Sequence, residues 1–426
     1  MPFVLKPGLL LGVTNAPMQS DGGHVDTNWH SWYARGHIKD GSDPAVAADH
    51  WKKWREDILL MGRLGIRTCR MGVEWARVEP AEGRFDDSAI AHLREEILLL
   101  RAMGIVPVLV LHHFSNPTWF EARGGWENRS SVSYFLRFVE KIVRVVGHLV
   151  NEYVTFNEPN TYSVNSYFYG IWPPAKKSSN AAIEVMSILA AAHIRAYRLI
   201  HEVRRTMGFE DTRVGAGIHM RVFAPRNPRN PLHTAAARTT RQLFQETLLE
   251  AMVTGHFRFP LKDYARVRQS RYADFYDLSY YSRSVVTRID DGLRENAPRN
   301  DMGWEIYPLG ISTVLQDVQR LAPLPVYLTS GVCDNDDSFR CRYIHDHLQV
   351  LCATDIPVER YYHRSLLDGF EWLEGKSAKF GLVSVEDGSF DRSVKQSGRF
   401  YAEIIRRRGV DEALYEDFVS GQSYHK

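Results

Sequence analysis

The sequence has few cysteines, almost no net charge and no long hydrophobic run. Four cysteines in 426 residues are too few for a disulfide scaffold, and they lack the spacing of zinc ligands. The 53 basic and 51 acidic residues leave a formal charge of +2, which argues against a polybasic nucleic-acid-binding protein. No stretch approaches the roughly 20 apolar residues of a membrane helix, and the N-terminal apolar run is too short for a secretory signal. We therefore expect a cytoplasmic protein that binds neither nucleic acid nor membrane; the sequence does not indicate its oligomeric state.

One pattern recurs along the chain: a short β-branched apolar run, a polar loop and then an amphipathic helix. Eight such runs are expected to be strands, over residues 9–13, 68–75, 106–114, 153–159, 213–220, 274–282, 325–332 and 359–370. Most are continuously apolar, which is typical of strands buried on both faces. Several helical patterns between them end near a glycine, a usual helix stop. The pattern predicts an α/β fold, a single (β/α)8 barrel domain over residues 1–426.

Polar residues gather where the expected strands end. In (β/α)8 barrels the chemistry lies at the C-terminal ends of the strands. The residues at these ends are Arg70, Glu74, His112, His113, Asn157, Glu158, Tyr280, Tyr281, Ser330 and Arg364. We expect the loops at this end of the barrel to form the active site.

The segment Thr155-Phe156-Asn157-Glu158-Pro159 closes the fourth expected strand. A carboxylic acid at this place could protonate a leaving oxygen, while the amide of Asn157 holds a neighbouring hydroxyl. Taken alone, the motif fits a surface glutamate before a helix equally well.

This pentapeptide resembles the acid/base signature of glycoside hydrolase family 1, the β-glucosidase and β-galactosidase group. Further segments similar to that family follow in order over nearly the whole chain, at residues 111–114, 124–126, 301–308, 365–372 and 379–383. The resemblance implies that Glu158 is the general acid/base. It implies sugar-binding roles for Gln19, His113, Asn157, Trp304, Glu371, Trp372 and Phe380. It implies a small-molecule β-glycoside as ligand and neither metal nor cofactor, although His113, Trp304 and Trp372 could instead be core residues.

The sequence departs from the family at the end of the seventh strand. Family members carry Thr-Glu-Asn-Gly there, and its Glu is the nucleophile; residues 327–332 read Tyr-Leu-Thr-Ser-Gly-Val, so Ser330 stands nearest the missing carboxylate. Retaining hydrolysis needs two carboxyl groups about 5–5.5 Å apart, so we expect no ordinary glycosyl-enzyme ester. Tyr281, which would face the nucleophile, and Arg70, which would pair with it, are kept. The candidate catalytic residues are Glu158, Ser330, Tyr281 and Arg70.

A second departure changes the charge of the expected pocket. Arg364 stands where the family's eighth-strand Trp forms the floor of the sugar site. Compared with the family pattern, the pocket therefore gains a cation at Arg364 and lacks the carboxylate of the nucleophile. A buried guanidinium without a partner is costly. Arg70 and Arg364 should therefore face either an anionic ligand, which suits the planar guanidinium, or internal carboxylates. The internal candidates are Glu74, Glu305, Asp334 and Asp336. The basic, proline-rich segment 221–231 at the same end could line the outer, leaving-group side of the cleft, but it is more typical of a solvated loop.

Three functions fit these residues. The first is an enzyme acting on a β-glycoside or an anionic sugar-like substrate, with Glu158 as acid and with water, a substrate group or an external anion in place of the nucleophile. Its reaction could be hydrolysis with inversion or group transfer. The second is a sugar-binding protein that has lost catalysis. The third is a barrel enzyme of small-molecule biosynthesis.

Overall fold

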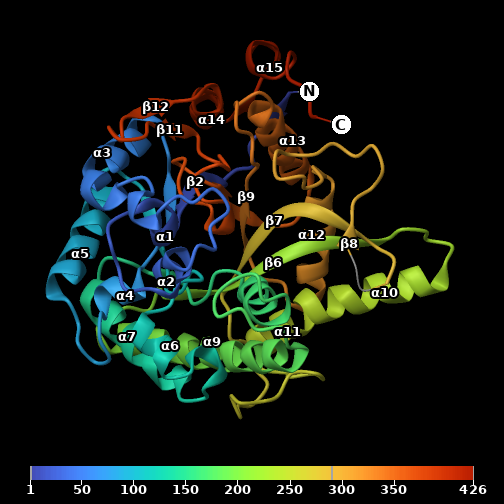
Figure 1. Cartoon of the computed structure of the whole chain (residues 1–426). Coiled ribbons are helices and arrows are strands. Elements are labelled where there is room, and N and C mark those ends of the chain that lie inside the picture. Colours follow the sequence, from blue (N-terminus) through green and yellow to red (C-terminus); the bar gives the residue numbers. More distant parts are fainter. Residues whose placement is uncertain (1, 289–290, 426) are drawn as a thin grey trace.

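A computed structural model describes residues 2–288 and 291–425, and its centre is a ring of eight parallel strands (Figure 1). The strands are β2 (Leu10–Asn15), β3 (Thr68–Gly72), β4 (Val106–Val110), β5 (Glu152–Val154), β6 (Arg213–Pro225), β7 (Phe275–Val286), β9 (Val326–Ser330) and β10 (Val358–His363). They pair in this order, and β10 pairs with β2 to close the ring. The predicted (β/α)8 barrel is confirmed, with a strand in each of the expected runs.

Helices follow the strands and cover the outside of the ring (Figure 1). The longer ones are α3 (His50–Arg63), α5 (Asp87–Ala102), α7 (Ser131–Val146), α9 (Ser179–Thr206), α10 (Pro231–Arg241), α11 (Thr247–Thr254), α12 (Gly310–Leu321), α13 (Arg340–Ala353) and α14 (Gln396–Arg407). In α7, Val132, Phe135, Val139 and Ile142 are buried at helical spacing, so one stripe of the helix packs on the barrel. Gly208, in the left-handed region at φ 89°, follows the end of α9 as a helix stop.

Shorter helices lie in the loops between these elements. They are α1 (Pro17–Ser20), α2 (Asn28–Ala34), α4 (Trp75–Val78), α6 (Thr118–Ala122), α8 (Pro159–Ser163) and α15 (Glu412–Phe418). Four of them, α1, α4, α6 and α8, are the first helices after barrel strands. They therefore begin at the end of the barrel where the predicted site lies.

The interior of the barrel is filled by side chains from alternate positions of the strands. Val108, Val154, Tyr327 and Tyr362 are fully buried in one cluster there. On the same strands, a residue two positions further along also points into the interior, and it lies nearer the carboxyl end of the barrel. Alternation therefore decides which strand-end side chains can reach a site at that end.

Two strands continue beyond the ring. β6 and β7 remain paired as far as Pro225 and Val286, where β8 (Asp291–Gly292) joins β7, and α10 projects beside them (Figure 1). Residues 221–225 are thus part of a strand, and the expectation of a solvated loop is wrong for them. The reason is that their backbone groups find partners in the equally long β7.

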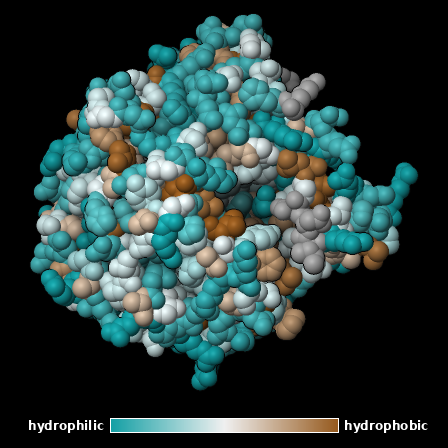
Figure 2. All heavy atoms as spheres, in the orientation of Figure 1, coloured by the Kyte–Doolittle hydropathy of each residue, from teal (hydrophilic) through white to brown (hydrophobic). Residues whose placement is uncertain are grey.

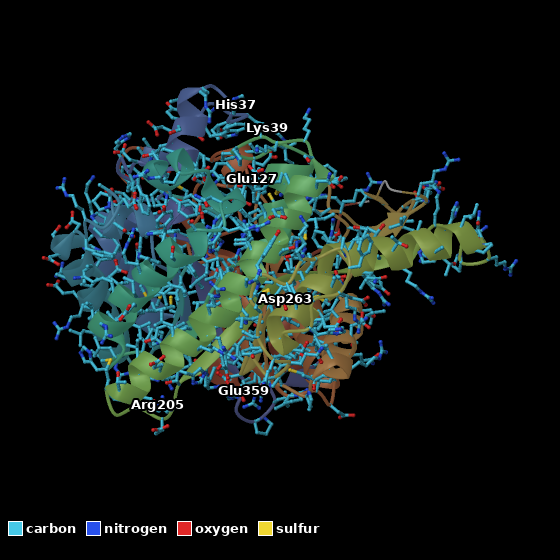
Figure 3. All side chains as sticks on the ribbon, turned by 90° about the horizontal axis from the view of Figure 1, so that it is seen from below. His37, Lys39, Glu127, Arg205, Asp263 and Glu359 are labelled. Carbon is cyan, nitrogen blue, oxygen red and sulfur yellow. The ribbon has the colours of Figure 1, made fainter. Side chains whose placement is uncertain are left out.

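The two ends of the barrel are distinguished in Figure 3, which shows Lys39 and Glu127 on one side and Arg205 and Glu359 on the opposite side. Glu359 stands near the start of β10, whereas Lys39 pairs with Glu374 after the carboxyl end of that strand. Within residues 2–288 and 291–425, none of the helices combines the length and the hydrophobicity needed to cross a bilayer.

Close strand contacts below the site predict the effect of one glycine substitution. A Cβ atom on Gly217 would lie 2.1 Å from the carbonyl oxygen of Phe156, a backbone atom that cannot easily move. Gly217→Ala should therefore lower the free energy of unfolding by about 1–3 kcal/mol, measured by urea denaturation. Gly421→Ala is the control because its Cβ would meet nothing within 4 Å. Equal stability of the two variants would contradict the close packing.

Candidate active site

A cavity of about 330 Å³ lies at the carboxyl ends of the strands. Figure 2 shows this face hollowed near its centre, with hydrophobic side chains along one edge. Most residues predicted from the sequence line this cavity: Arg70, His113, Asn157, Glu158, Tyr281, Trp304, Arg364, Glu371 and Trp372. They come from loops and strand ends all around the ring, so the barrel brings together residues that are far apart in the chain.

Glu158 presents its carboxyl group to the cavity beside Tyr281 and His219. Tyr281 Oη donates to Glu158 Oε1 at 3.2 Å, and His219 Nδ1 lies 3.6 Å from Oε2. Burial, together with the charges of Arg221 and Arg364, holds the pKa of His219 well below its usual value, so this imidazole is neutral at pH 7. Glu158 is therefore not locked in an ion pair with His219 and can exchange a proton with a ligand.

The backbone of Glu158 helps to aim the carboxyl group. Glu158 precedes α8 and has φ 40°, in the left-handed region that side chains rarely adopt. Such a conformation costs about 1–3 kcal/mol and persists only where the surroundings impose it. Pro159, the first residue of α8, starts the helix directly after it.

Arg70 fills the floor of the cavity and has an internal carboxylate partner. Its Nε donates to Asp277 Oδ1 at 3.0 Å and its Nη2 to Asp277 Oδ2 at 2.7 Å. The same Nη2 donates to Asn157 Oδ1 at 2.7 Å, which orients the amide next to Glu158. Both members of the ion pair are almost fully buried. Arg70 therefore needs no ligand charge.

Arg364 also has an internal partner. Its Nη2 donates to both carboxylate oxygens of Glu371, and Gln19 Nε2 donates to Glu371 Oε2 at 2.6 Å. Gln19 and Phe380 do not line the main cavity; they line an adjacent one of about 30 Å³.

Of the two alternatives, internal carboxylates pair with both arginines, but the four carboxylates nominated from the sequence are not the partners. Glu305 pairs with Arg283, Asp334 accepts the backbone N–H of Phe339, and Asp336 is exposed. Glu74 accepts from Ser115 Oγ beside a separate small cavity. The sequence does hold one signal for Asp277, which is an acidic residue within an apolar run, four positions before Tyr281 and so on the same strand face.

A model described as glycosyl hydrolase family 1 matches residues 16–410 of this sequence. The chain belongs to glycosyl hydrolase family 1. The resemblance seen in its motifs is thus confirmed over nearly the whole chain.

Relatives in the family are similar over their full lengths. Beta-glucosidase A of Thermotoga maritima is 28% identical, covering 95% of this chain and 98% of that protein, and a beta-galactosidase of Pyrococcus woesei is 24% identical, covering 97% and 99%. A solved beta-glycosidase from Pyrococcus horikoshii has a TM-score of 0.90 at 30% identity and covers 99% of both chains. The T. maritima family 1 beta-glucosidase in complex with isofagomine lactam has a TM-score of 0.88 at 27% identity, covering 96% and 100%.

The strand that carries the nucleophile in the family pattern here brings Thr329 to the cavity. Tyr327 lies in the barrel interior, so Thr329 faces inward and Ser330 faces the surrounding helices. Ser330 Oγ accordingly donates to the carbonyl oxygen of Tyr280 at 2.8 Å and lies 2.8 Å from Tyr343 Oη. The structure corrects the expected placement of Ser330, and strand alternation in the sequence could have identified Thr329.

Aromatic rings form much of the remaining wall. Trp372 lies 5.9 Å from the ring of His113 in a stacked arrangement, and both line the cavity. Burial, with the charges of Arg70 and Arg364, holds the pKa of His113 well below its usual value, so it is neutral at pH 7. Phe223 also lines the cavity, as the alternative for segment 221–231 expected, whereas sequence reasoning missed Tyr169, Ile171, Trp172 and Phe244.

A ligand would therefore meet charged groups at the floor of the cavity and apolar rings near its mouth. Across the described parts of the chain, no three His, Cys, Asp or Glu side chains are grouped as metal ligands.

The buried pair below the cavity predicts a large loss of stability when Asp277 is neutralised. Asp277→Asn should lower the free energy of unfolding by about 3–5 kcal/mol because Arg70 keeps its charge without a partner. The measurement is urea denaturation near neutral pH. Asp336→Asn, at an exposed carboxylate, is the control. Equal stability of the two variants would show that Asp277 is not needed to balance the charge of Arg70.

Glu74 predicts a pH-dependent change in stability. Burial raises its pKa from 4.5 to about 7, so the folded protein resists ionisation that the unfolded chain permits. This contribution to stability is fully present below about pH 4.5 and is lost as the pH rises through about 7. Glu74→Gln lacks the titration, so its stability relative to the parent should increase by roughly 3 kcal/mol between about pH 4 and about pH 8.

Urea denaturation at both pH values measures this difference. Glu202→Gln, on the exposed surface of α9, is the matched control. A relative stability of Glu74→Gln that stays constant with pH would show that burial does not perturb this carboxyl group.

Proposed function

We propose that this family 1 chain is an enzyme that cleaves or transfers β-glycosides with Glu158 as general acid/base and without a carboxylate nucleophile from the protein. Two features of the cavity support this most. Glu158 faces the cavity beside Tyr281 and a neutral His219, and Thr329 stands on the strand where the family pattern has its nucleophile. The names of the relatives, beta-glucosidase and beta-galactosidase, suggest the class of sugar. A single domain over residues 1–426 and a cytoplasmic location belong to the same proposal.

The reaction would be a single displacement. Glu158 gives its proton to the leaving oxygen as the bond from that oxygen to the anomeric carbon breaks. An oxygen nucleophile that is not part of the protein attacks the opposite face of the same carbon, so the product has the inverted configuration. A water molecule that attacks passes one proton to the surrounding solvent, and Glu158 regains a proton from solvent, whereas an anion such as formate or phosphate attacks without losing a proton. An added anion should therefore react faster than water.

The internal pairing of Arg70 and Arg364 bears on the nature of this acceptor. Asp277 and Glu371 already balance the two guanidinium groups. An anion trapped between the arginines is therefore not needed for charge balance. The proposal accordingly relies on water as the ordinary acceptor and on added anions as a test.

Glu158→Gln tests this function. The variant should lower kcat/KM for aryl β-glucosides and β-galactosides by about 10²–10⁴-fold, because a glutamine cannot donate the proton. Turnover is followed with and without formate, azide or phosphate, and NMR identifies the anomer first released. The control is Glu127→Gln, at the same end of the barrel but paired with Lys176 outside the cavity lining. A retained product, or unchanged turnover in Glu158→Gln, would refute the proposal.

A second candidate is a sugar-binding protein without catalysis. The side chain of Thr329 supports it, because a neutral hydroxyl in this place cannot replace a carboxylate in double displacement. Calorimetry separates the two functions. Tight binding of a glycoside with no product from any donor or acceptor would favour the binding protein, and inverted product would favour the enzyme.

A further inference from the structure

The ion pair between Arg364 and Glu371 divides the space at the carboxyl end of the barrel. Thr14, Arg364 and Glu371 line both the main cavity and the smaller one, whereas Gln19 lines only the smaller one. The smaller cavity holds about 30 Å³, which is room for one or two water molecules and not for a sugar ring. Gln19 is therefore separated from the main cavity by the paired side chains.

The strand geometry directs Arg364 into this position. Its backbone N–H donates to the carbonyl oxygen of Ser330 at 2.9 Å, so the chain still follows β9 at this point. Tyr362 faces the barrel interior, and alternation turns Arg364 to the same side.

Aromatic rings then hold the guanidinium group. Its central carbon lies 4.3 Å from the ring centre of Phe380 and 5.6 Å from that of Tyr281. Contacts of this kind favour a cation over the ring face. Arg364 is thus held by rings as well as by its carboxylate partner.

The pair also occupies the hydrogen-bonding capacity of Glu371. One nitrogen of Arg364 reaches both carboxylate oxygens, and Gln19 adds a bond of 2.6 Å to one of them. A neutral sugar hydroxyl would have to compete with a charged donor for the same oxygens, and bonds between charged groups are the stronger ones. The side chains of Arg364 and Glu371 are about nine-tenths buried, so water does little to weaken the pair.

We propose that Arg364 is a specificity-determining residue, which closes the Gln19 end of the cavity by pairing with Glu371. The cavity then takes a neutral sugar ring weakly, and most of the binding must come from an apolar group on the ligand. That group would lie against Phe223 and Phe244, two partly exposed rings of the cavity wall. The ligand class is a glycoside with an aromatic or other apolar aglycone. The inference rests on the proposed function for its ligand class, but its test uses binding alone.

Calorimetry with isofagomine lactam, an uncharged sugar mimic bound by the T. maritima relative, tests the closure. Arg364→Met should bind the lactam about tenfold to hundredfold more tightly than the parent, because it frees a charged acceptor and joins the two cavities. Arg364→Lys keeps a cation that can pair with Glu371 and should bind as weakly as the parent. Arg221→Met removes a cation from the same cavity without touching the pair and should also show no gain.

Further comparisons make the outcome decisive. Arg364→Gln, a smaller and uncharged replacement, takes the place of Arg364→Met if thermal melting shows that the methionine variant does not fold. In the parent, a phenyl β-glucoside should bind at least about tenfold more tightly than methyl β-glucoside, as the apolar wall requires. The proposal is overturned if neither neutral variant binds the lactam more tightly than the parent, or if Arg221→Met gains as much. These binding measurements do not depend on catalysis, so they would stand even if Glu158→Gln did not lower turnover as expected.

Discussion

Two arginine side chains at the carboxyl end of the barrel each require a negative charge, and the form of the cavity depends on where those charges lie. Arg70 finds Asp277 on β7, and Arg364 finds Glu371 beside the cavity. Removing a guanidinium from water without a partner costs several kcal/mol, so both pairs must persist in the folded state. The first pair places a salt bridge beneath the site, and the second divides the space above it.

These pairs explain how a family 1 chain can lack a glutamate on β9 and still keep Arg70. In the family pattern this arginine pairs with the nucleophile. Here the charge is supplied from β7, and the hydrogen bond from Arg70 to Asn157 keeps the neighbour of Glu158 in place. The side of the cavity that holds Glu158 is thus supported independently of β9.

The barrel and most of the cavity could be predicted from the sequence because they follow from local patterns. Apolar runs predict the strands, and the position of Glu158, Tyr281 and His113 at strand ends predicts that these residues belong to the site. Ser330 was misplaced because a motif comparison ignores the side of the strand on which a residue lies, although alternation would have favoured Thr329. Asp277 and the Gln19–Glu371–Arg364 contact were harder to predict, because they join residues that are far apart in the chain and meet only after the ring closes.

The extension of β6 and β7 gives the two sides of the cavity different mechanical support. The floor, with Arg70 and Asp277, is built within the closed ring of eight strands. Arg221 and Phe223 instead belong to the strand pair that runs past the ring, and Thr240 and Phe244 to the helical segment after it. Insertions or substitutions in this outer arm can reshape the side of the cavity that it lines while the hydrogen bonds that close the barrel stay the same. The two halves of a ligand would then be recognised by parts of the chain that are free to diverge at different rates.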